Sequence, residues 1–235
     1  MKRIFCFATG NLWKWAKTDN RGPLLNYIRK LDIEGVEITF AEINELNAFR
    51  VSKTNMEWLK TLDYVTIHAP FRRPKGMSDT DYIAPVYRLY KKLGAQHIII
   101  HPQDLPEYSV LRKYRMNVST ENMRPYKHIS HSDLERILRT YRGMGLCIDV
   151  AHAYVHSKDE TKKLVERFRD KITQVHLSGT YGKQDHRSLR IVTKRFMESI
   201  EPIRQLDVPI VIEESMKKKT IQYIKDEIAY CRSLF

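Results

Sequence analysis

The segment GLCIDVAHAY, residues 145–154, places a carboxylate and an imidazole at short spacing. Asp149 ends a short apolar run, and His152 follows three residues later, where a helix is expected to begin. A carboxylate at a strand end with an imidazole one turn further on can present two ligands to a metal ion or a substrate. The same spacing fits an aspartate that caps a helix beside a hydrogen-bonded histidine. The other strand ends must decide between these interpretations.

Residues of the same types stand at or near the ends of other apolar runs: Glu37, His68, His101, Glu121, His176 and Glu213. A lone histidine at a strand end is more often a hydrogen-bonding core residue than a ligand. Five consecutive strands that end in such residues with one parity are hard to obtain by chance. Several carboxylates and imidazoles around one cavity would repel or titrate unless a cation lay among them. Mixed oxygen and nitrogen ligands suit manganese, zinc, magnesium or cobalt. We therefore predict a divalent metal site.

Eight short apolar runs, mostly separated by helical patterns, are available to position these residues. They are Ile4–Ala8, Val36–Phe40, Tyr64–His68, His97–His101, Asn117–Glu121, Leu146–Asp149, Ile172–His176 and Pro209–Glu213. Alternation of strand and helix predicts an α/β protein with a parallel sheet. Eight repeats without a linker predict that residues 1–235 form one domain, a single compact (β/α)8 TIM barrel with short βα loops. A doubly wound open sheet is the alternative fold.

Side-chain alternation along the strands favours a closed barrel. Counting back by two from the polar strand ends gives Thr66, Ser119, Cys147 and Gln174, which should share the inner face with the ligands. The opposite parity is almost entirely Val, Ile and Leu, as expected for a face covered by helices. Because the carboxyl ends of barrel strands form the active site, we expect the strand-end residues to meet at one mouth.

The helices between the strands have recognisable boundaries. Thr54 with Glu57, Ser132 with Glu135 and Ser157 with Glu160 have the spacing of a capping box, which predicts helix starts. Gly94 and Gly143 suit helix ends. The connection over residues 103–114 has the weakest helical pattern.

The charge of the chain favours an anionic partner. A net charge of +13 and a pI near 9.6 point to nucleic acid, phosphorylated metabolites or an acidic surface. Basic residues follow four of the strands: Arg72, Arg73, Lys75, Arg124, Lys127, Lys183, Arg187, Arg190 and the run Lys217–Lys219. Trp13 and Trp15 could stack on a base or a sugar.

The composition predicts a globular cytoplasmic protein that does not bind a membrane. No apolar run approaches the ~20 residues that span a bilayer. The run Ile4–Phe7 is too short for the hydrophobic region of a signal peptide. Three widely spaced cysteines make a disulfide framework or a cysteine zinc site unexpected.

The segments YVTIHAPF, IIIHPQD, STENM, GLCIDVAHAY, QVHLSG with a later DHRSL, and PIVIEES resemble successive strand-end motifs of the xylose isomerase-like TIM barrel superfamily. The resemblance covers nearly the whole barrel. That superfamily contains sugar (phosphate) isomerases and epimerases and the endonuclease IV type of abasic-site nuclease. The resemblance implies a shared metal quartet of Glu121, Asp149, His176 and Glu213. Only this resemblance favours Glu213 over Glu214 as the fourth metal ligand.

Resemblance to the nuclease branch implies two to three zinc ions, with His68, His101, His152 and His186 as further ligands. Metal-activated water would then attack a phosphodiester. Several residues depart from that branch. Gln184 stands where an aspartate is expected, with Asp185 one place off, and Phe71 replaces a tyrosine. Gln103 and Asp104 replace a glycine-serine pair, and IFCFATGN lacks a glycine-histidine signature.

Resemblance to the isomerase and epimerase branch implies one metal ion that stabilises an enediolate, with Glu121 and Glu213 exchanging protons. The residues expected to contact the substrate are Glu37, His68, Arg72, Arg73, His101, His152, Lys183 and His186. The GVEI segment favours this branch, although a glycine-rich tail after His186 is missing. We therefore expect a metal-dependent isomerase or epimerase that acts on an anionic sugar. The alternative is an endonuclease IV-like zinc phosphodiesterase acting on abasic-site DNA. A barrel that only binds an anionic ligand is a third reading.

Overall fold

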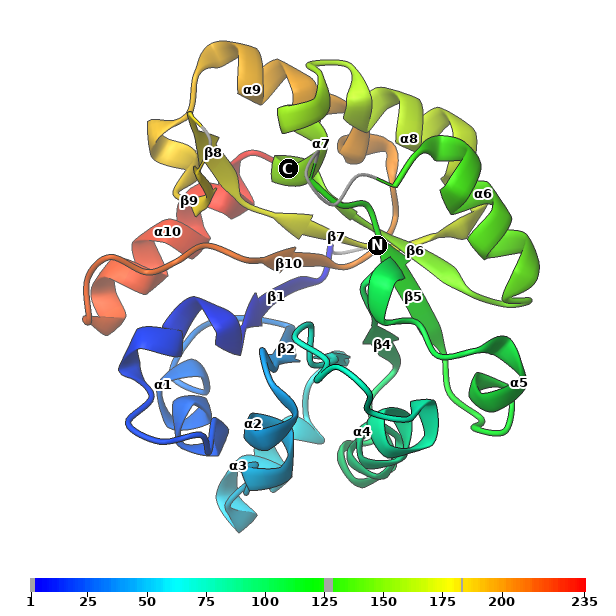
Figure 1. Cartoon of the computed structure of the whole chain (residues 1–235). Helices are drawn as coiled ribbons and strands as arrows, with labels where there is room; N and C mark the ends of the chain where they lie inside the picture. Colours follow the sequence, from blue (N-terminus) through cyan, green and yellow to red (C-terminus); the bar gives the residue numbers. More distant parts are fainter. Residues whose placement is uncertain (1–2, 125–128, 183) are drawn as a thin grey trace.

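In the computed structural model, which describes residues 3–124, 129–182 and 184–235, eight parallel strands close into a barrel. The strand order is β1-β10-β7-β6-β5-β4-β3-β2, and helices lie around the outside (Figure 1). The barrel strands are β1 (Phe5–Ala8), β2 (Gly35–Thr39), β3 (Tyr64–His68), β4 (His97–Ile99), β5 (Val118–Glu121), β6 (Gly145–Asp149), β7 (Ile172–Leu177) and β10 (Ile210–Ile212). Each predicted run overlaps one of these strands, so the predicted (β/α)8 barrel is confirmed.

The helices that follow the strands differ widely in length. The α-helices are α1 (Leu25–Ile28), α2 (Ile43–Ala48), α3 (Lys53–Leu59), α4 (Asp79–Leu93), α5 (Tyr108–Leu111), α6 (His131–Thr140), α7 (Val150–His156), α8 (Glu160–Phe168), α9 (Lys194–Ile200) and α10 (Ile221–Ser233). Short 3-10 turns are η1 (Thr9–Trp15), η2 (Gly22–Leu24), η3 (Pro102–Asp104), η5 (Arg169–Lys171), η6 (Leu189–Ile191) and η7 (Glu201–Gln205). Across the described ranges, no helix has the length and apolar character to cross a membrane.

The predicted capping boxes at Thr54, Ser132 and Ser157 are wrong in detail. The first two helices are capped two residues earlier: the Ser52 hydroxyl accepts a hydrogen bond from the backbone N–H of Asn55, and Ser130 forms a reciprocal capping box with Asp133. The residue that can cap a helix is the one directly before the first turn, whose backbone is still extended. The third helix, α8, begins after Asp159 without a side-chain cap. Gly94 ends α4 with a φ of 64°, as predicted.

The barrel separates two hydrophobic layers, as the strand parity predicts. Outward residues such as Val65, Ile67, Leu146 and Ile148 belong to the large core between the strands and the helices. A small inner cluster of Cys6, Ala8, Tyr64 and Val211 fills the barrel itself. Thr66, Ser119, Cys147 and Gln174 are completely buried. The inner face is therefore mixed in polarity and the outer face apolar, which is the pattern of a closed barrel.

Two glycines allow the lower part of the barrel to fill with side chains from neighbouring strands. A Cβ at Gly35 would lie 2.5 Å from the Cys6 Sγ, and one at Gly145 would lie 2.6 Å from the Ser119 Oγ and 2.3 Å from the Thr173 Cγ2. These positions have no room for a larger residue, because the adjacent strands already occupy the space.

A hairpin that the sequence did not predict extends beyond the barrel between β7 and α9 (Figure 1). Its antiparallel strands are β8 (Gly179–Tyr181) and β9 (Gln184–Arg187). The backbone N–H of Ser215 donates to the His186 carbonyl at 2.9 Å, which ties the hairpin to the segment after β10. The hairpin thereby holds its residues over the carboxyl ends of the barrel strands.

Candidate metal centre

The carboxylate of Glu121, at the end of β5, is the hub of the mouth and is only 1% exposed. Its Oε2 lies 3.5 Å from the His68 Nε2, 3.7 Å from the His101 Nε2 and 3.5 Å from the His176 Nδ1. Its Oε1 lies 3.0 Å from the His152 Nδ1. Three histidines at or just after strand ends, together with His152 of α7, thus converge on one buried carboxylate.

The histidine rings are held in place through their other nitrogen atoms. The His68 Nδ1 contacts the carbonyl of Ala69 at 3.0 Å, and the His186 Nδ1 contacts the carbonyl of Glu213 at 2.9 Å. The His101 Nδ1 lies 3.2 Å from the Gln103 amide nitrogen. A ring fixed at one nitrogen presents the other in a defined direction, as in protein metal sites.

His176 shows the same arrangement deep in the barrel. Its Nε2 lies 3.2 Å from the Glu37 Oε2, and its Nδ1 lies 3.2 Å from the Glu213 Oε2. The Gln174 amide donates to Glu37 at 3.0 Å and accepts from the Tyr64 hydroxyl at 3.0 Å. Glu37 is completely buried within this chain of contacts and lines neither cavity at the mouth. Its position therefore suits orientation of His176 rather than contact with a substrate.

The two side-chain oxygens of Asp149 have different surroundings. Its Oδ1 accepts a hydrogen bond from the backbone N–H of His152 at 2.7 Å and so caps α7. Its Oδ2 is buried and accepts no hydrogen bond from any described residue. The side-chain amide of Asn122 fixes the strand end, since it accepts from the Asp149 N–H at 2.8 Å and donates to the Asp149 carbonyl at 2.9 Å. Asn122 was not among the predicted site residues, although it directly follows Glu121.

The two neighbouring glutamates at the end of β10 point in different directions. Glu213 lies against His176 and lines both cavities. Glu214 accepts the backbone N–H of Leu189 at 3.0 Å and lies against Cys231 of α10. Glu213 is therefore the glutamate that faces the mouth.

Asp185 and His186 are consecutive residues, yet both enter the site. Neighbouring side chains on a regular strand point to opposite faces. His186 has a φ of 49°, which breaks that alternation. As a result the Asp185 Oδ2 lies 3.4 Å from the His152 Nε2 and 3.5 Å from the His186 Nε2. An irregular backbone thus compensates for the one-residue displacement of the aspartate in the sequence.

The donor set fits divalent cations. Buried atoms without a hydrogen-bond partner among the described residues include the Glu121 Oε2, the Asp149 Oδ2 and the His176 Nδ1. Groups whose ligand atoms lie within 4.8 Å of one another are His68–His101–Glu121, Glu121–Asp149–His152, Glu37–His176–Glu213, Glu121–Cys147–His176 and His152–Asp185–His186. Unpaired buried acceptors facing imidazole nitrogens are the arrangement that oxygen- and nitrogen-binding metals require.

Buried carboxylates at the mouth raise the pKa values of the neighbouring histidines. Burial opposes charging of His152, but the charge of Asp149 and the contact with Glu121 outweigh it and raise its pKa to about 9. Burial likewise opposes charging of His68, and its contact with Glu121 raises the pKa to about 8. Burial by itself would raise the pKa of Glu213, yet the charges of His176 and His186 lower it to about 2. The carboxylates of the site therefore stabilise positive charge beside them.

Two cavities open at the mouth. The smaller, of about 180 Å³, is lined by His68, Phe71, His101, Glu121, Met123, Arg124, His152, Asp185, His186 and Glu213. The larger, of about 390 Å³, lies beside it and is lined by residues of η1, by Thr39, Ala41, Glu45, Phe71 and Arg72, and by Arg21, His186, Glu213 and Ser215. Trp13 lines the larger cavity and is 51% exposed.

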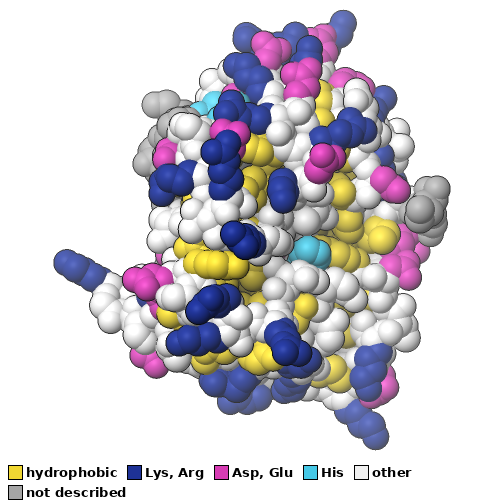
Figure 2. All heavy atoms as spheres, turned by 90° about the vertical axis from the view of Figure 1, so that its right-hand side faces the viewer, with side chains coloured by type: hydrophobic (Ala, Val, Ile, Leu, Met, Phe, Trp, Pro, Cys, Tyr) yellow, Lys and Arg dark blue, Asp and Glu magenta, His cyan; other side chains and the backbone are white. Residues whose placement is uncertain are grey.

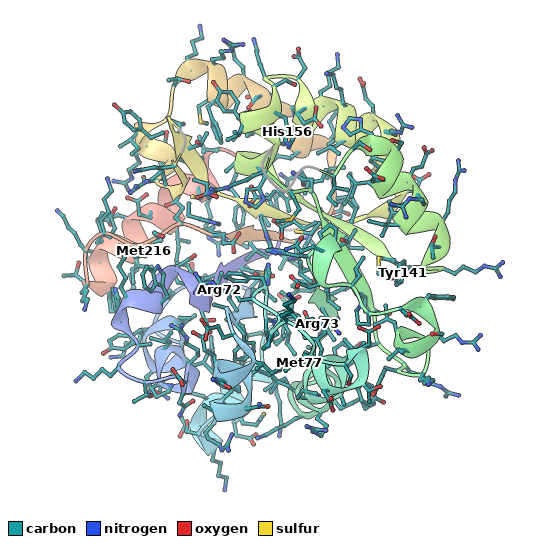
Figure 3. All side chains as sticks on the ribbon, in the orientation of Figure 1. Arg72, Arg73, Met77, Tyr141, His156 and Met216 are labelled. Carbon is teal, nitrogen blue, oxygen red and sulfur yellow. The ribbon has the colours of Figure 1, made fainter. Side chains whose placement is uncertain are left out.

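The basic residues predicted to contact a substrate have different surroundings. The side chain of Arg72 is 67% exposed at the rim of the larger cavity. Arg73 is held beside Met77 (Figure 3), where it donates to the Met77 carbonyl at 2.6 Å and pairs with Asp79 at 2.6 Å. Arg73 lines neither cavity and so stabilises its own loop. The prediction for Lys183 lies outside the described residues.

No protein-family model matches the sequence. A search of curated proteins finds no match either. Among solved structures, a D-tagatose 3-epimerase-like protein shares 15% identity and a TM-score of 0.71, over 98% of this chain and 96% of that one. A structure described as AsfvAP:AG shares 15% identity and a TM-score of 0.68, over 99% of both chains. A xylose isomerase domain containing protein from Salmonella typhimurium LT2 shares 12% identity and a TM-score of 0.71, over 100% of this chain and 97% of that one. The chain has the fold of xylose isomerase-like TIM barrel proteins.

Proposed function

We propose that this protein is a metal-dependent phosphodiesterase that cleaves nucleic acid at abasic sites, with a centre of two or more divalent ions. The observation that supports this most is the number of potential ligands. Five histidines, Asp149, Asp185, Glu121 and Glu213 converge at one mouth. One ion that chelates a sugar needs about four protein ligands, so the additional imidazoles favour a centre with more than one ion.

His68, His101 and Glu121 would hold one ion, and Asp149, His176 and Glu213 would complete a second site together with Glu121. Divalent ions held there would polarise the phosphoryl oxygens and lower the pKa of a water molecule. Glu121 would hold the two sites together, because its carboxylate already lies within 3.7 Å of three imidazoles that face the mouth. Phe71 stacks on the His101 ring at 5.4 Å and forms one wall of the smaller cavity.

Positive charge around the mouth supports an anionic polymer as the substrate. Arg72 is exposed at the rim, and Arg124 lines the smaller cavity. An arginine guanidinium attracts phosphate through its permanent positive charge and its planar set of donors. The net charge of +13 adds a long-range attraction for nucleic acid.

A sugar isomerase or epimerase is the second candidate, and the larger cavity favours it. Its volume of about 390 Å³ suits a small-molecule ligand, and Glu213 and His186 line it. In that reading Glu121 and Glu213 would exchange protons with a bound sugar on either side of a single ion. With a single ion, this candidate gives the group of His68, His101 and Glu121 no metal of its own, so we place it second.

The test is cleavage of a DNA duplex that contains a tetrahydrofuran abasic-site analogue, with protein reconstituted in Zn²⁺ or Mn²⁺. We expect a single cut beside the analogue. Glu121→Gln should lose activity by at least ~100-fold, because it replaces a shared anionic ligand with a neutral one. Glu57→Gln is the matched control, since that side chain is exposed on α3, where it pairs with Lys60. Metal-loaded protein that leaves the duplex intact would refute the proposal. Deuterium exchange into a pentose or hexose phosphate would then support the second candidate.

A further inference from the structure

One positively charged side chain, that of Arg124, lies at the mouth. Arg124, three residues beyond Glu121, forms an ion pair with the Asp185 Oδ2 through its Nη2. The same oxygen lies 3.4 Å from the His152 Nε2 and 3.5 Å from the His186 Nε2. His152, Asp185 and His186 form the most exposed of the candidate metal groups. The guanidinium therefore contacts the only anionic member of that group.

We propose that Arg124 takes the place of a third metal ion, so that the chain holds two ions and one fixed guanidinium. This inference rests on the proposed metal centre and specifies its composition. It assigns His68, His101, Glu121, Asp149, His176 and Glu213 to metal ions. His152 and His186 then contact Asp185 without completing a third metal site.

Charge and burial support this division. The side chains of Arg124 and Asp185 are only 20% and 11% exposed, so their ion pair is largely removed from water. An ion entering between Asp185 and the two histidines would displace the guanidinium and leave it partly buried without its partner. The loss of one partner from a buried ion pair is strongly unfavourable. Arginine also keeps its charge at every pH at which the protein is folded, so deprotonation cannot vacate the position.

The replacement has a consequence for the substrate. Arg124 lines the smaller cavity together with His101 and Glu121. The ion pair with Asp185 holds the guanidinium, and its positive charge, at the edge of that cavity. A positive charge fixed there would stabilise the negative charge that develops on the phosphate being cleaved.

The number of bound ions tests this inference without reference to activity. Apo protein would be equilibrated with excess Zn²⁺, freed of unbound metal and analysed by elemental mass spectrometry. We expect two zinc ions per wild-type chain and three per Arg124→Ala chain. Arg124→Gln, which keeps much of the side-chain volume, should also bind three. The double variant Arg124→Ala/Asp185→Asn should return to two, because the third group loses its anion. Arg88→Ala, exposed on α4, is the control and should bind two.

Three zinc ions in the wild-type chain, or no gain in either Arg124 variant, would overturn the inference and leave the phosphodiesterase proposal intact. No bound zinc in any variant would overturn the metal centre itself. Melting curves of the apo variants would establish that each is folded. The abasic-site assay gives a second readout: Arg124→Ala should lose phosphodiesterase activity about 10- to 100-fold, since an arginine that contacts the phosphate contributes to the transition state.

Discussion

The contact made by one ring nitrogen of a histidine fixes the direction in which the other nitrogen can bind a ligand. His68, His176 and His186 contact a carbonyl or carboxylate through one nitrogen and face the mouth with the other. The same carboxylates that would share a metal ion raise the pKa of His68 and His152 when no cation is present. Metal ions bind the neutral ring, so metal binding must release these protons. Metal affinity and stability of the metal-free protein should consequently depend on pH in opposite directions.

We predict that the metal-free protein loses thermal stability as pH rises from 6.5 to 9. The pKa of His68 is about 8 and that of His152 about 9, above the unfolded value near 6.5. Their stabilising contribution is therefore fully present below pH 6.5 and is lost as pH rises through 8 to 9. Melting curves in the presence of a chelator should show a fall of several degrees. Over the same range, zinc affinity should rise.

Metal-free Glu121→Gln supplies the comparison for this pH dependence. Without the anion at position 121, the pKa values of both histidines should fall toward the ordinary range. The melting temperature of the variant should thus change less between pH 6.5 and 9. A wild-type slope equal to that of the variant would contradict the assignment of the effect to these histidines.

At the scale of elements, α10 is joined to the barrel and to the ligand-bearing hairpin by two buried carboxyl groups. Glu214 at the end of β10 and Glu227 on α10 are 1% and 2% exposed. The Ser188 hydroxyl, just after β9, donates to Glu227 at 2.7 Å, while the Leu189 N–H donates to Glu214. Burial, and then the charge of Glu227, raise the pKa of Glu214 to about 8. The junction is therefore stable when the pair carries a proton.

We predict that Glu227→Gln stabilises the protein at pH 8 relative to wild type, by roughly 1 kcal/mol, and changes its stability less at pH 5. A carboxyl group whose folded pKa lies above its unfolded value costs stability as pH rises from about 4.5 to 8. Glutamine keeps an acceptor for Ser188 and removes the charge beside Glu214. Urea unfolding at both pH values measures the difference. Glu166→Gln, exposed on α8, is the control. Equal destabilisation of Glu227→Gln at both pH values would disprove the role assigned to the pair.

At the scale of the whole molecule, positive charge extends well beyond the mouth. Figure 2 shows Lys and Arg side chains spread over the visible face, with Asp and Glu among them. The excess of 41 basic over 28 acidic residues gives the chain a field that attracts polyanions from any direction. The mouth adds locally placed arginines, including the exposed Arg72. The salt dependence of binding, measured in wild type and in variants of single arginines, should separate the general attraction from the local contacts.

We predict that affinity for the abasic-site duplex falls at least tenfold between 50 and 200 mM salt, because bound phosphates release condensed counterions. Arg72→Ala should reduce the slope of log affinity against log salt by about 1. Arg88→Ala, on the flank of α4, should leave that slope unchanged. Fluorescence anisotropy in a chelator separates binding from cleavage. Affinity that is independent of salt would indicate that the mouth does not bind a polyanion.

The sequence by itself determined the barrel and the residue types at its mouth. Period-two alternation separates an apolar outer face from a mixed inner face, and both parities hold from Val65 to Ile212. Strand ends of a parallel barrel must share one mouth, so Glu121, Asp149 and His176 could be brought together before any contact was known. The sequence could not choose between Glu213 and Glu214, because the strand ends there and strict alternation no longer applies.

Only the tertiary structure decided the contacts made by irregular backbone. The left-handed His186 brings Asp185 to His152, and this step lies in a hairpin that strand periodicity does not reveal. Contacts between Arg124 and Asp185 join the β5 and β7 connections, which are far apart in the chain. Asp149 seemed to require a choice between helix cap and ligand, yet one oxygen caps α7 while the other has no hydrogen-bond partner among the described residues. Local spacing encodes which residues reach the mouth, whereas the paths of the loops determine which of their atoms face one another.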